Sequence, residues 1–398
     1  PAARPLMGDS TKNDNQQPAF VARVVKGIGE ISATDWDACA GADNPFVSHA
    51  FLAALEESGS AALETGWAPH HMLLEDALGQ VQGVAPLYLK NHSQGEYVFD
   101  HGWADAFERA GGAYYPKLQL CVPFSPVTGP RLMVRPGPDA DASRRALIAA
   151  CMELTERANV SSLHVTFATE DDWQALADAG FLQRSDRQFH WTNDGYADFD
   201  GFLASLASRK RKAVRRERRG ALASGLTIEV LTGNDIKSIH WDAFFACYVE
   251  TSHGKWGYPY LNREFFTRLG ETLAHKVALI MASDDGRYVA GALNLIGADT
   301  FYGRNWGCIG HYPFLHFEVC YYSAIEFAIE RGLKYVEAGA QGHHKIARGY
   351  LPVRTHSAHW ISHAGLRDAI EDYLGHERDA VDDEIEALAD YSPFRKED

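Results

Sequence analysis

The chain contains an internal repeat whose two copies lie 169 residues apart. Gly180-Phe181-Leu182 precedes His190-Trp191, and Gly349-Tyr350-Leu351 precedes His359-Trp360, with ten residues from glycine to histidine in both copies. Similar patterns precede each copy: strand pairs, a helix (143–158 or 319–331) and a short strand (162–167 or 335–338). The sequence therefore predicts a mixed α/β fold made by duplication of a unit of about 170 residues. Two unrelated α/β domains are the alternative.

Composition places the chain among globular proteins. Of its 398 residues, 46% are apolar and 23% are charged, and no apolar run is long enough to span a bilayer. Six cysteines without C-x-x-C spacing argue against a zinc ribbon and against a disulfide scaffold. Residues 1–19 are polar and lack the apolar centre of a signal peptide, which predicts a flexible leader. These features favour a soluble, cytoplasmic protein.

Charge is distributed unevenly along the chain. The net charge is −15, yet residues 209–219, RKRKAVRRERR, carry +7, and residues 367–398 carry −8. We expect a basic helix over 202–223 and an acidic helical tail after residue 366. Because like charges on one helix repel, the basic run calls for a negative partner: the acidic tail, a phosphate-bearing ligand, or nucleic acid such as tRNA. The candidate donor-phosphate ligands are Arg209, Lys210, Arg211, Lys212, Arg215 and Arg216.

Several common sites are absent from the sequence. No P-loop or G-x-S-x-G motif occurs, and the histidine pairs lack H-E-x-x-H spacing. These absences argue against a nucleotide-binding P-loop and a serine hydrolase of that type, and we expect neither a metal nor a tightly bound cofactor.

The stretch 335–354, YVEAGAQGHHKIARGYLPVR, is the strongest candidate site. Glu337 lies near the end of a predicted strand, and small residues follow it, which let a ligand approach the backbone closely. A carboxylate, imidazoles and cations together suit a general base beside an anion clamp. A glycine-rich turn whose charges face water is the alternative.

Several residues of this stretch receive a hypothetical role. Glu337 or His343 is the candidate base, and Tyr350 is the candidate acid for the leaving group. Candidate substrate-binding residues come from the same stretch and from polar, aromatic loops: Lys345, Arg348, Arg304, Trp306, Gly339, Gln341, Gly342, His253, Lys255, Trp256, Tyr115 and Lys117.

Three segments resemble the FemAB-like family of predicted N-acyltransferases in the GNAT superfamily. They are SRKRKAVRRERR (208–219), YYPKLQLCVPFSPVTGPR (114–131) and EAGAQGHHKIARGYLPV (337–353). The resemblance covers nearly the whole chain after the leader. It implies two tandem GNAT-like domains, 20–195 and 196–366, with the basic helix at the start of the second and the acidic tail over 367–398.

The resemblance also implies an activity. The wider Fem relatives transfer an aminoacyl group from aminoacyl-tRNA to an amine of a peptidoglycan precursor, and ordinary GNAT relatives transfer an acyl group from coenzyme A. We therefore expect an N-acyltransferase or aminoacyltransferase that acts on an amine of a peptide-like or cell-wall-precursor-like acceptor. The other readings are an acyl-CoA enzyme for small amines and a non-catalytic module that binds phosphate or peptide; the oligomeric state is open.

One departure from the GNAT pattern bears on the donor. The loop that cradles coenzyme A in GNAT enzymes resembles [QR]-x-x-G-x-[GA]. The matching segment here, 304–310, has one residue too many between its glycines, and Pro313, which lacks an amide donor, follows it. Together with the basic helix, this favours aminoacyl-tRNA over acyl-CoA as the donor.

Overall fold

The structure, a computed structural model, describes residues 19–223, 225–255, 258–339 and 342–395. All but the last residue of the expected leader lie outside them. The strands are β1 (Phe20–Val25), β2 (Trp67–Pro69), β3 (His71–Asp76), β4 (Val81–Ala85), β5 (Leu87–Lys90), β6 (Lys117–Leu120), β7 (Met133–Val134), β8 (Ser162–Ala168), β9 (Leu182–Thr192), β10 (Thr227–Thr232), β11 (Val277–Asp284), β12 (Arg287–Ile296), β13 (Thr300–Cys308), β14 (Tyr335–Glu337) and β15 (Leu351–Ile361).

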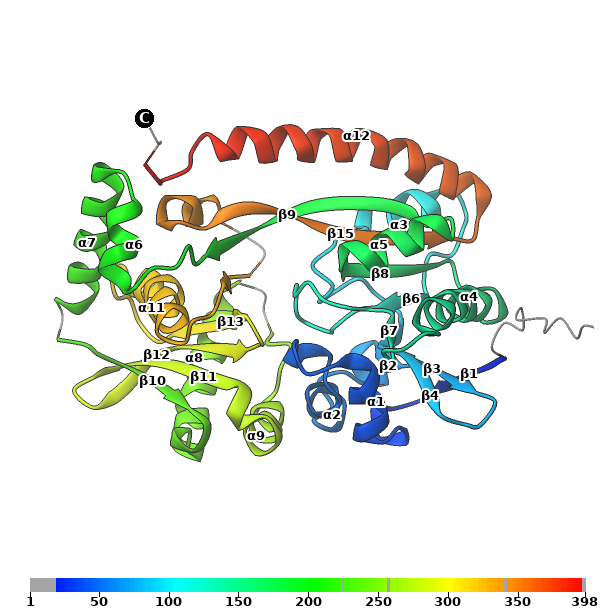
Figure 1. Ribbon diagram of the computed structural model, residues 1–398, viewed down its shortest axis with the longest axis horizontal. Helices are drawn as coiled ribbons and strands as arrows, with labels where there is room; N and C mark the ends of the chain where they lie inside the picture. The colour runs from blue at the N-terminus through cyan, green and yellow to red at the C-terminus, as the bar shows by residue number, and fades with distance from the viewer. Residues whose placement is uncertain (1–18, 224, 256–257, 340–341, 396–398) are drawn as a thin grey trace, which may run out of the picture.

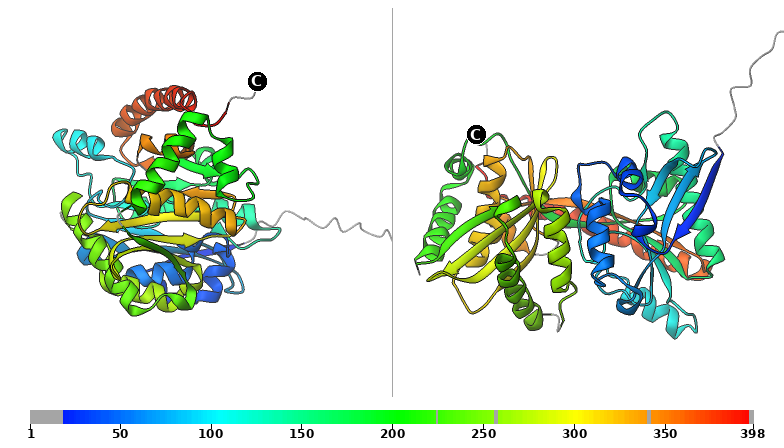
Figure 2. Two further views of the ribbon diagram at one scale, coloured as in Figure 1. Left: turned by 90° about the vertical axis from the view of Figure 1, so that its left-hand side faces the viewer. Right: turned by 90° about the horizontal axis from the view of Figure 1, so that it is seen from below.

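Helices cover both sheets of the molecule (Figures 1 and 2). They are α1 (Ala33–Ala40), α2 (His49–Glu57), α3 (His101–Arg109), α4 (Ala140–Arg157), α5 (Glu170–Asp178), α6 (Phe199–Ser205), α7 (Ser208–Leu222), α8 (Ser238–Lys255), α9 (Arg263–Thr272), α10 (Leu315–Phe317), α11 (Ser323–Glu330) and α12 (Ala364–Ala389). A π-helical turn, η6 (Glu318–Tyr322), precedes α11, and a 3-10 segment, η7 (His343–Arg348), precedes β15. None of the helices described here is both long and apolar enough to cross a membrane.

The two halves of the chain share one large sheet. Its strand order is β10-β11-β12-β13-β14-β9-β15-β8-β6-β5-β2, and a smaller sheet has the order β1-β3-β4-β7. The last strand of each half pairs with the other half: β9 with β14, and β15 with β8. The two long strands also pair with each other and lie side by side beneath α12 (Figure 1). The halves are therefore joined by an exchange of terminal strands.

The register of β9 against β15 matches the internal repeat. Leu182 lies opposite His359, and Leu351 lies opposite His190. Each pair joins the start of one repeat copy to the end of the other, so a pseudo-twofold axis passes between the strands near Asp186 and Thr355, which are also paired. The duplication predicted from the sequence is confirmed, and the repeated segments are the exchanged strands.

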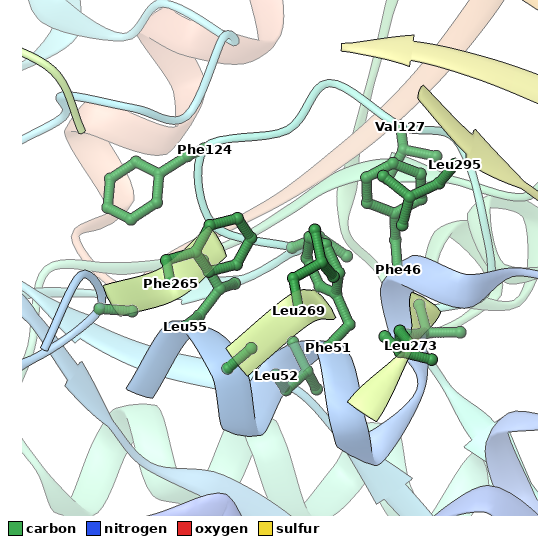
Figure 3. Close-up of a cluster of buried hydrophobic side chains, with 14 of the residues drawn as sticks. Phe46, Phe51, Leu52, Leu55, Phe124, Val127, Phe265, Leu269, Leu273 and Leu295 are labelled. Carbon is green, nitrogen blue, oxygen red and sulfur yellow. The ribbon is translucent and has the colours of Figure 1, made fainter. Parts of the chain in front are cut away.

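A hydrophobic core also joins the halves. Helix α2 of the first half packs on α9 of the second (Figure 3). The buried side chains on α2 include Phe51 and Leu52, and those on α9 include Phe265 and Leu269. Burying each such side chain contributes about 1.5–3 kcal/mol. The relative position of the two halves is thus fixed by packing as well as by strand pairing.

The structure departs from the sequence pattern in two places. Residues 97–99, which alternate like a strand, form an irregular loop, because Tyr97 adopts a left-handed backbone conformation (φ 61°). The single basic helix expected over 202–223 is two helices, because Leu206 and Ala207 have extended backbone. Leu206 pairs there with Phe394 from the chain end.

The acidic tail is a docked helix rather than a solvated one. Helix α12 buries Leu366, Ile370 and Leu374. Its acids pair with arginines of the exchanged strands: Glu377 with Arg184, Glu384 with Arg187 and Asp382 with Arg354. The tail therefore compensates charge on β9 and β15.

Candidate functional site

The candidate site lies where two parallel strands of the second half separate. Strands β13 and β14 pair over only three residues each, and the last pair is Tyr302 with Glu337. Beyond that pair, Arg304 turns back and its Nη2 donates a hydrogen bond to Glu337 Oε2 at 2.8 Å. Both side chains are more than nine-tenths buried. Glu337 and Arg304, both candidates from the sequence, are thus brought into direct contact.

A histidine from the first half completes this pair. The register of β9 on β14 places His190 opposite Glu337, with its Nε2 3.8 Å from Glu337 Oε1. Burial lowers the pKa of His190, against the attraction of the Glu337 carboxylate, so the ring is neutral at pH 7. In the sequence, His190 stands out only as part of the internal repeat. The signal that could have assigned it to this site is the strand exchange, which the repeat alone does not reveal.

Lys345 is the third charged group at the site. It lies in η7, is buried, and its Nζ donates a hydrogen bond to the Gly339 carbonyl at 2.8 Å. Burial, followed by the positive charge of Arg304, lowers its pKa to about 7. Gly339 has φ +76°, a conformation that glycine adopts without strain. Near neutral pH a large fraction of Lys345 is therefore an uncharged amine able to accept a proton.

Residues of the first half also line one side of the site. Arg304 Nε donates to Ser125 Oγ at 3.1 Å, and its guanidinium lies 4.9 Å from the centre of the Phe46 ring. Both partners precede the exchanged strand in the first half. The site is therefore built between the halves and requires both.

Other residues of the stretch 335–354 point away from Glu337. Tyr350 is fully buried and donates from its hydroxyl to the Tyr321 carbonyl at 3.3 Å. His343 is exposed and its ring approaches Glu384 of α12 at 3.9 Å. Arg348 binds Glu217 of α7 at 2.9 Å. These three side chains hold η7 against its neighbours and do not reach the Glu337 carboxylate.

The remaining second-half candidates are scattered. Trp306 packs on the ring of His316, with 5.2 Å between ring centres, and His253 is exposed near Tyr258. Lys255 ends α8, and Gly342 precedes η7 with φ +115°. Gln341 and Trp256 lie outside the described residues.

The first-half candidates belong to a separate buried cluster. Lys117 Nζ donates to Glu96 at 2.7 Å, to Ser93 at 2.7 Å and to Asp100, and Tyr115 shares a hydrogen bond with Ser93. Although burial opposes ionisation, the Lys117 ammonium lowers the pKa of Asp100. The structure thus places Lys117 and Tyr115 in a closed charge network rather than beside Glu337.

This cluster adjoins the pseudo-symmetric counterpart of the site. In the first half, His164 lies opposite His359 of the exchanged strand, as Glu337 lies opposite His190 in the second. Burial lowers the pKa of His164 to about 3, so it is neutral at pH 7. The first copy therefore carries an imidazole where the second copy carries a carboxylate.

Helix α7 separates its charges onto two faces. Glu217 and Arg218 face the protein, where Arg218 binds Glu318 and Glu326 at 2.8 Å each. On the opposite face, four exposed cations follow a spacing of three, four and three residues, which forms one stripe about 15 Å long. We call this the cationic stripe: Arg209, Lys212, Arg216 and Arg219.

The other predicted phosphate ligands lie beside the stripe. Arg215 binds Asp200 at 3.2 Å, and Lys210 and Arg211 are half-buried. A cavity of about 410 Å³ opens next to the stripe between α6 and α7. Its lining combines three arginines with three acids and two apolar residues: Arg215, Arg218, Arg219, Asp198, Asp200, Glu326, Phe199 and Leu203. No ion pair among the described residues joins α12 to the stripe, because the α12 acids bind the exchanged strands. Within the described residues, the acidic tail therefore forms no ion pair with the stripe.

The segment that matches the coenzyme A loop is part of a strand. Gly307 lies in β13, and a Cβ there would come within 2.2 Å of the Cys247 backbone. The absence of a side chain lets α8 pack closely on β13. The close packing of α8 is therefore enough to explain why residue 307 is glycine, and no bound phosphate is needed to explain it.

Comparison with known proteins supports the expected family. The family model described as FemAB-like, peptidoglycan biosynthesis/recognition, matches residues 27–396. A crystal structure of FemX has a TM-score of 0.53 at 13% identity, covering 86% of this chain and 98% of its own. The structure of L-PGS from Bacillus licheniformis has a TM-score of 0.50 at 10% identity, covering 83% and 96%. No curated protein matches the chain in sequence.

These likenesses in structure concern the fold, and the family model carries the assignment. The expected mixed α/β fold is confirmed, and the FemX and L-PGS structures share it. The chain belongs to the FemAB-like family of peptidoglycan biosynthesis/recognition.

Proposed function

We propose that this protein transfers an aminoacyl group from aminoacyl-tRNA to a free amine of a peptidoglycan precursor peptide, at the site around Glu337. The observation that carries the proposal is the buried Glu337–Arg304 ion pair beside Lys345, whose pKa of about 7 suits proton transfer at neutral pH. Membership of a family described by peptidoglycan biosynthesis/recognition supports this class of acceptor.

The reaction is aminolysis of an ester. The amine nitrogen attacks the ester carbonyl, a C–N bond forms, and the bond from the carbonyl carbon to the ribose oxygen breaks. In this proposal neutral Lys345 takes the proton that the amine loses and then passes it to the leaving ribose oxygen. Glu337 is oriented by Arg304 on Oε2 and directs Oε1 to the N–H of the acceptor.

Helix α7 supplies the donor contacts in this proposal. The cationic stripe binds phosphates of the RNA, while the inner face of the same helix is tied to η7 through the Glu217–Arg348 ion pair at 2.9 Å. Since η7 carries Lys345, this connection relates the donor-binding helix to the proton acceptor. The packing role of Gly307 removes one reason to expect a coenzyme A cradle.

A direct assay separates the candidate donors. The protein is incubated with a precursor pentapeptide and either radiolabelled aminoacyl-tRNA or radiolabelled acetyl-CoA, and the label on the peptide is counted. We expect transfer from aminoacyl-tRNA. Transfer from acetyl-CoA alone would assign the chain to the acyl-CoA enzymes, and no transfer from either donor would favour a binding module. Cytoplasmic localisation stays a prediction from the sequence.

A further inference from the structure

Strand β10 lies at one edge of the large sheet. Among the described residues, its only backbone partner is β11. It has six residues, TIEVLT, which are mostly β-branched and include neither proline nor lysine; its one charged residue, Glu229, accepts a hydrogen bond from Tyr288 of β12. The opposite edge strand, β2, has only three residues and ends in Pro69, which cannot donate a ladder hydrogen bond. Exposed edges without such protection pair readily with another strand.

The two faces of β10 differ. Leu231 is buried in the core formed with α8 and α9. Ile228 and Val230 alternate with it and point to the opposite face, where they line a cavity of about 260 Å³ together with Leu222 of α7. Val230 and Leu222 are 40% and 44% exposed. A strand added at this edge would place every second side chain over this cavity.

The cavity is acidic as well as apolar. Its other lining residues include Glu318, Glu326 and Glu330, against the single cation Arg218. Arg218 is already bound by Glu318 and Glu326. Glu330 is exposed, and within the described part of the chain it forms no ion pair. A basic side chain between two apolar ones complements this lining.

We propose that the β10 edge binds an extended peptide segment of another protein as an added strand, with a lysine or arginine directed at Glu326 and Glu330. Main-chain hydrogen bonds supply affinity, and the alternating side chains over the cavity supply specificity. A second copy of this chain fits less well, because it would bring the same three glutamates to the edge. The edge lies four strands from β14, about 19 Å away, so this surface is separate from the proposed transfer site.

The test uses a designed probe. A fluorescent, capped peptide Val-Thr-Lys-Thr-Val-Thr places valine, lysine and valine on one face when extended, and its partner probe carries glutamate in place of lysine. Fluorescence anisotropy is measured with the full chain. We expect saturable binding of the lysine probe with a dissociation constant below about 1 mM, and binding of the glutamate probe at least about fivefold weaker.

Variants locate the site on the protein. Glu330→Lys, at an exposed position, should reverse the preference between the two probes, whereas Glu371→Lys, an equally exposed change on α12, should leave it unaltered. Val230→Lys should weaken the binding of both probes, because a charged side chain on an edge strand disfavours pairing with an added strand. Equal affinity for both probes in wild type, or an unchanged ratio in Glu330→Lys, overturns the proposal. A native mass of two chains that Val230→Lys reduces to one also overturns it, because a second copy then occupies the edge.

Discussion

Removing the centre of the cationic stripe should change the salt dependence of tRNA binding by a calculable amount. Each phosphate neutralised by a cation contributes about −0.7 to −0.9 to the slope of log K against log salt concentration. Four stripe residues therefore predict a slope of about −2.8 to −3.6. Raising the salt concentration fourfold, from about 50 to 200 mM, should weaken binding about 50- to 150-fold.

The variant K212A/R216A removes two of the four cations. Its slope should fall to about −1.4 to −1.8, so the same rise in salt weakens binding only about 7- to 12-fold. Filter binding of labelled tRNA at several salt concentrations measures both slopes. R109A/R145A, which removes two exposed arginines of the first half, is the matched control and should keep the wild-type slope. A wild-type slope in K212A/R216A would refute the assignment of the stripe to the donor.

Three further changes test other parts of the account. Because Lys345 must be neutral to accept a proton, the transfer rate should rise as pH passes upward through about 7, and Lys345→Met should remove this inflection in a pH–rate profile; an unchanged inflection would assign it to another group. Lys117→Met leaves the buried Asp100 without its cation and leaves the buried Glu96 with Lys90 alone, at 3.7 Å. Urea denaturation should therefore show a loss of about 3–5 kcal/mol in the free energy of unfolding, against less than about 0.5 kcal/mol for exposed Lys334→Met. Gly307→Ala forces a Cβ against the Cys247 backbone and should lower stability by about 1–3 kcal/mol in the same assay; wild-type stability would mean that α8 does not pack as described.

Much of the fold could be predicted from the sequence, because the strongest signals in the sequence are periodic. The repeat around His190 and His359 predicted the duplication, and the apolar stripe beginning near residue 143 predicted α4. The exchange of β9 and β15 could not be predicted, since a repeat reports that two segments are alike and not which strand each one joins.

The site was predicted in part for a similar reason. Glu337, Arg304 and Lys345 stand beside strand ends and small residues, and the structure brings them together. His343 and Tyr350 share the same stretch of sequence, but His343 in η7 faces α12, whereas Tyr350, which follows η7, lies in the core. The closeness of these two residues along the chain therefore did not determine where their side chains point. His190 illustrates the opposite case, because its place beside Glu337 depends on a partner 147 positions away that no local pattern identifies.

The most direct test of the central claim is the single-turnover rate of aminoacyl transfer by Glu337→Gln, measured at saturating donor and precursor peptide. Because the amide cannot form the same ion pair with Arg304 or hold the acceptor amine as a carboxylate does, the account predicts a rate reduced by about 10² or more with tRNA affinity unchanged. A wild-type rate in this variant would contradict the claim that the reactive site lies where β13 and β14 separate.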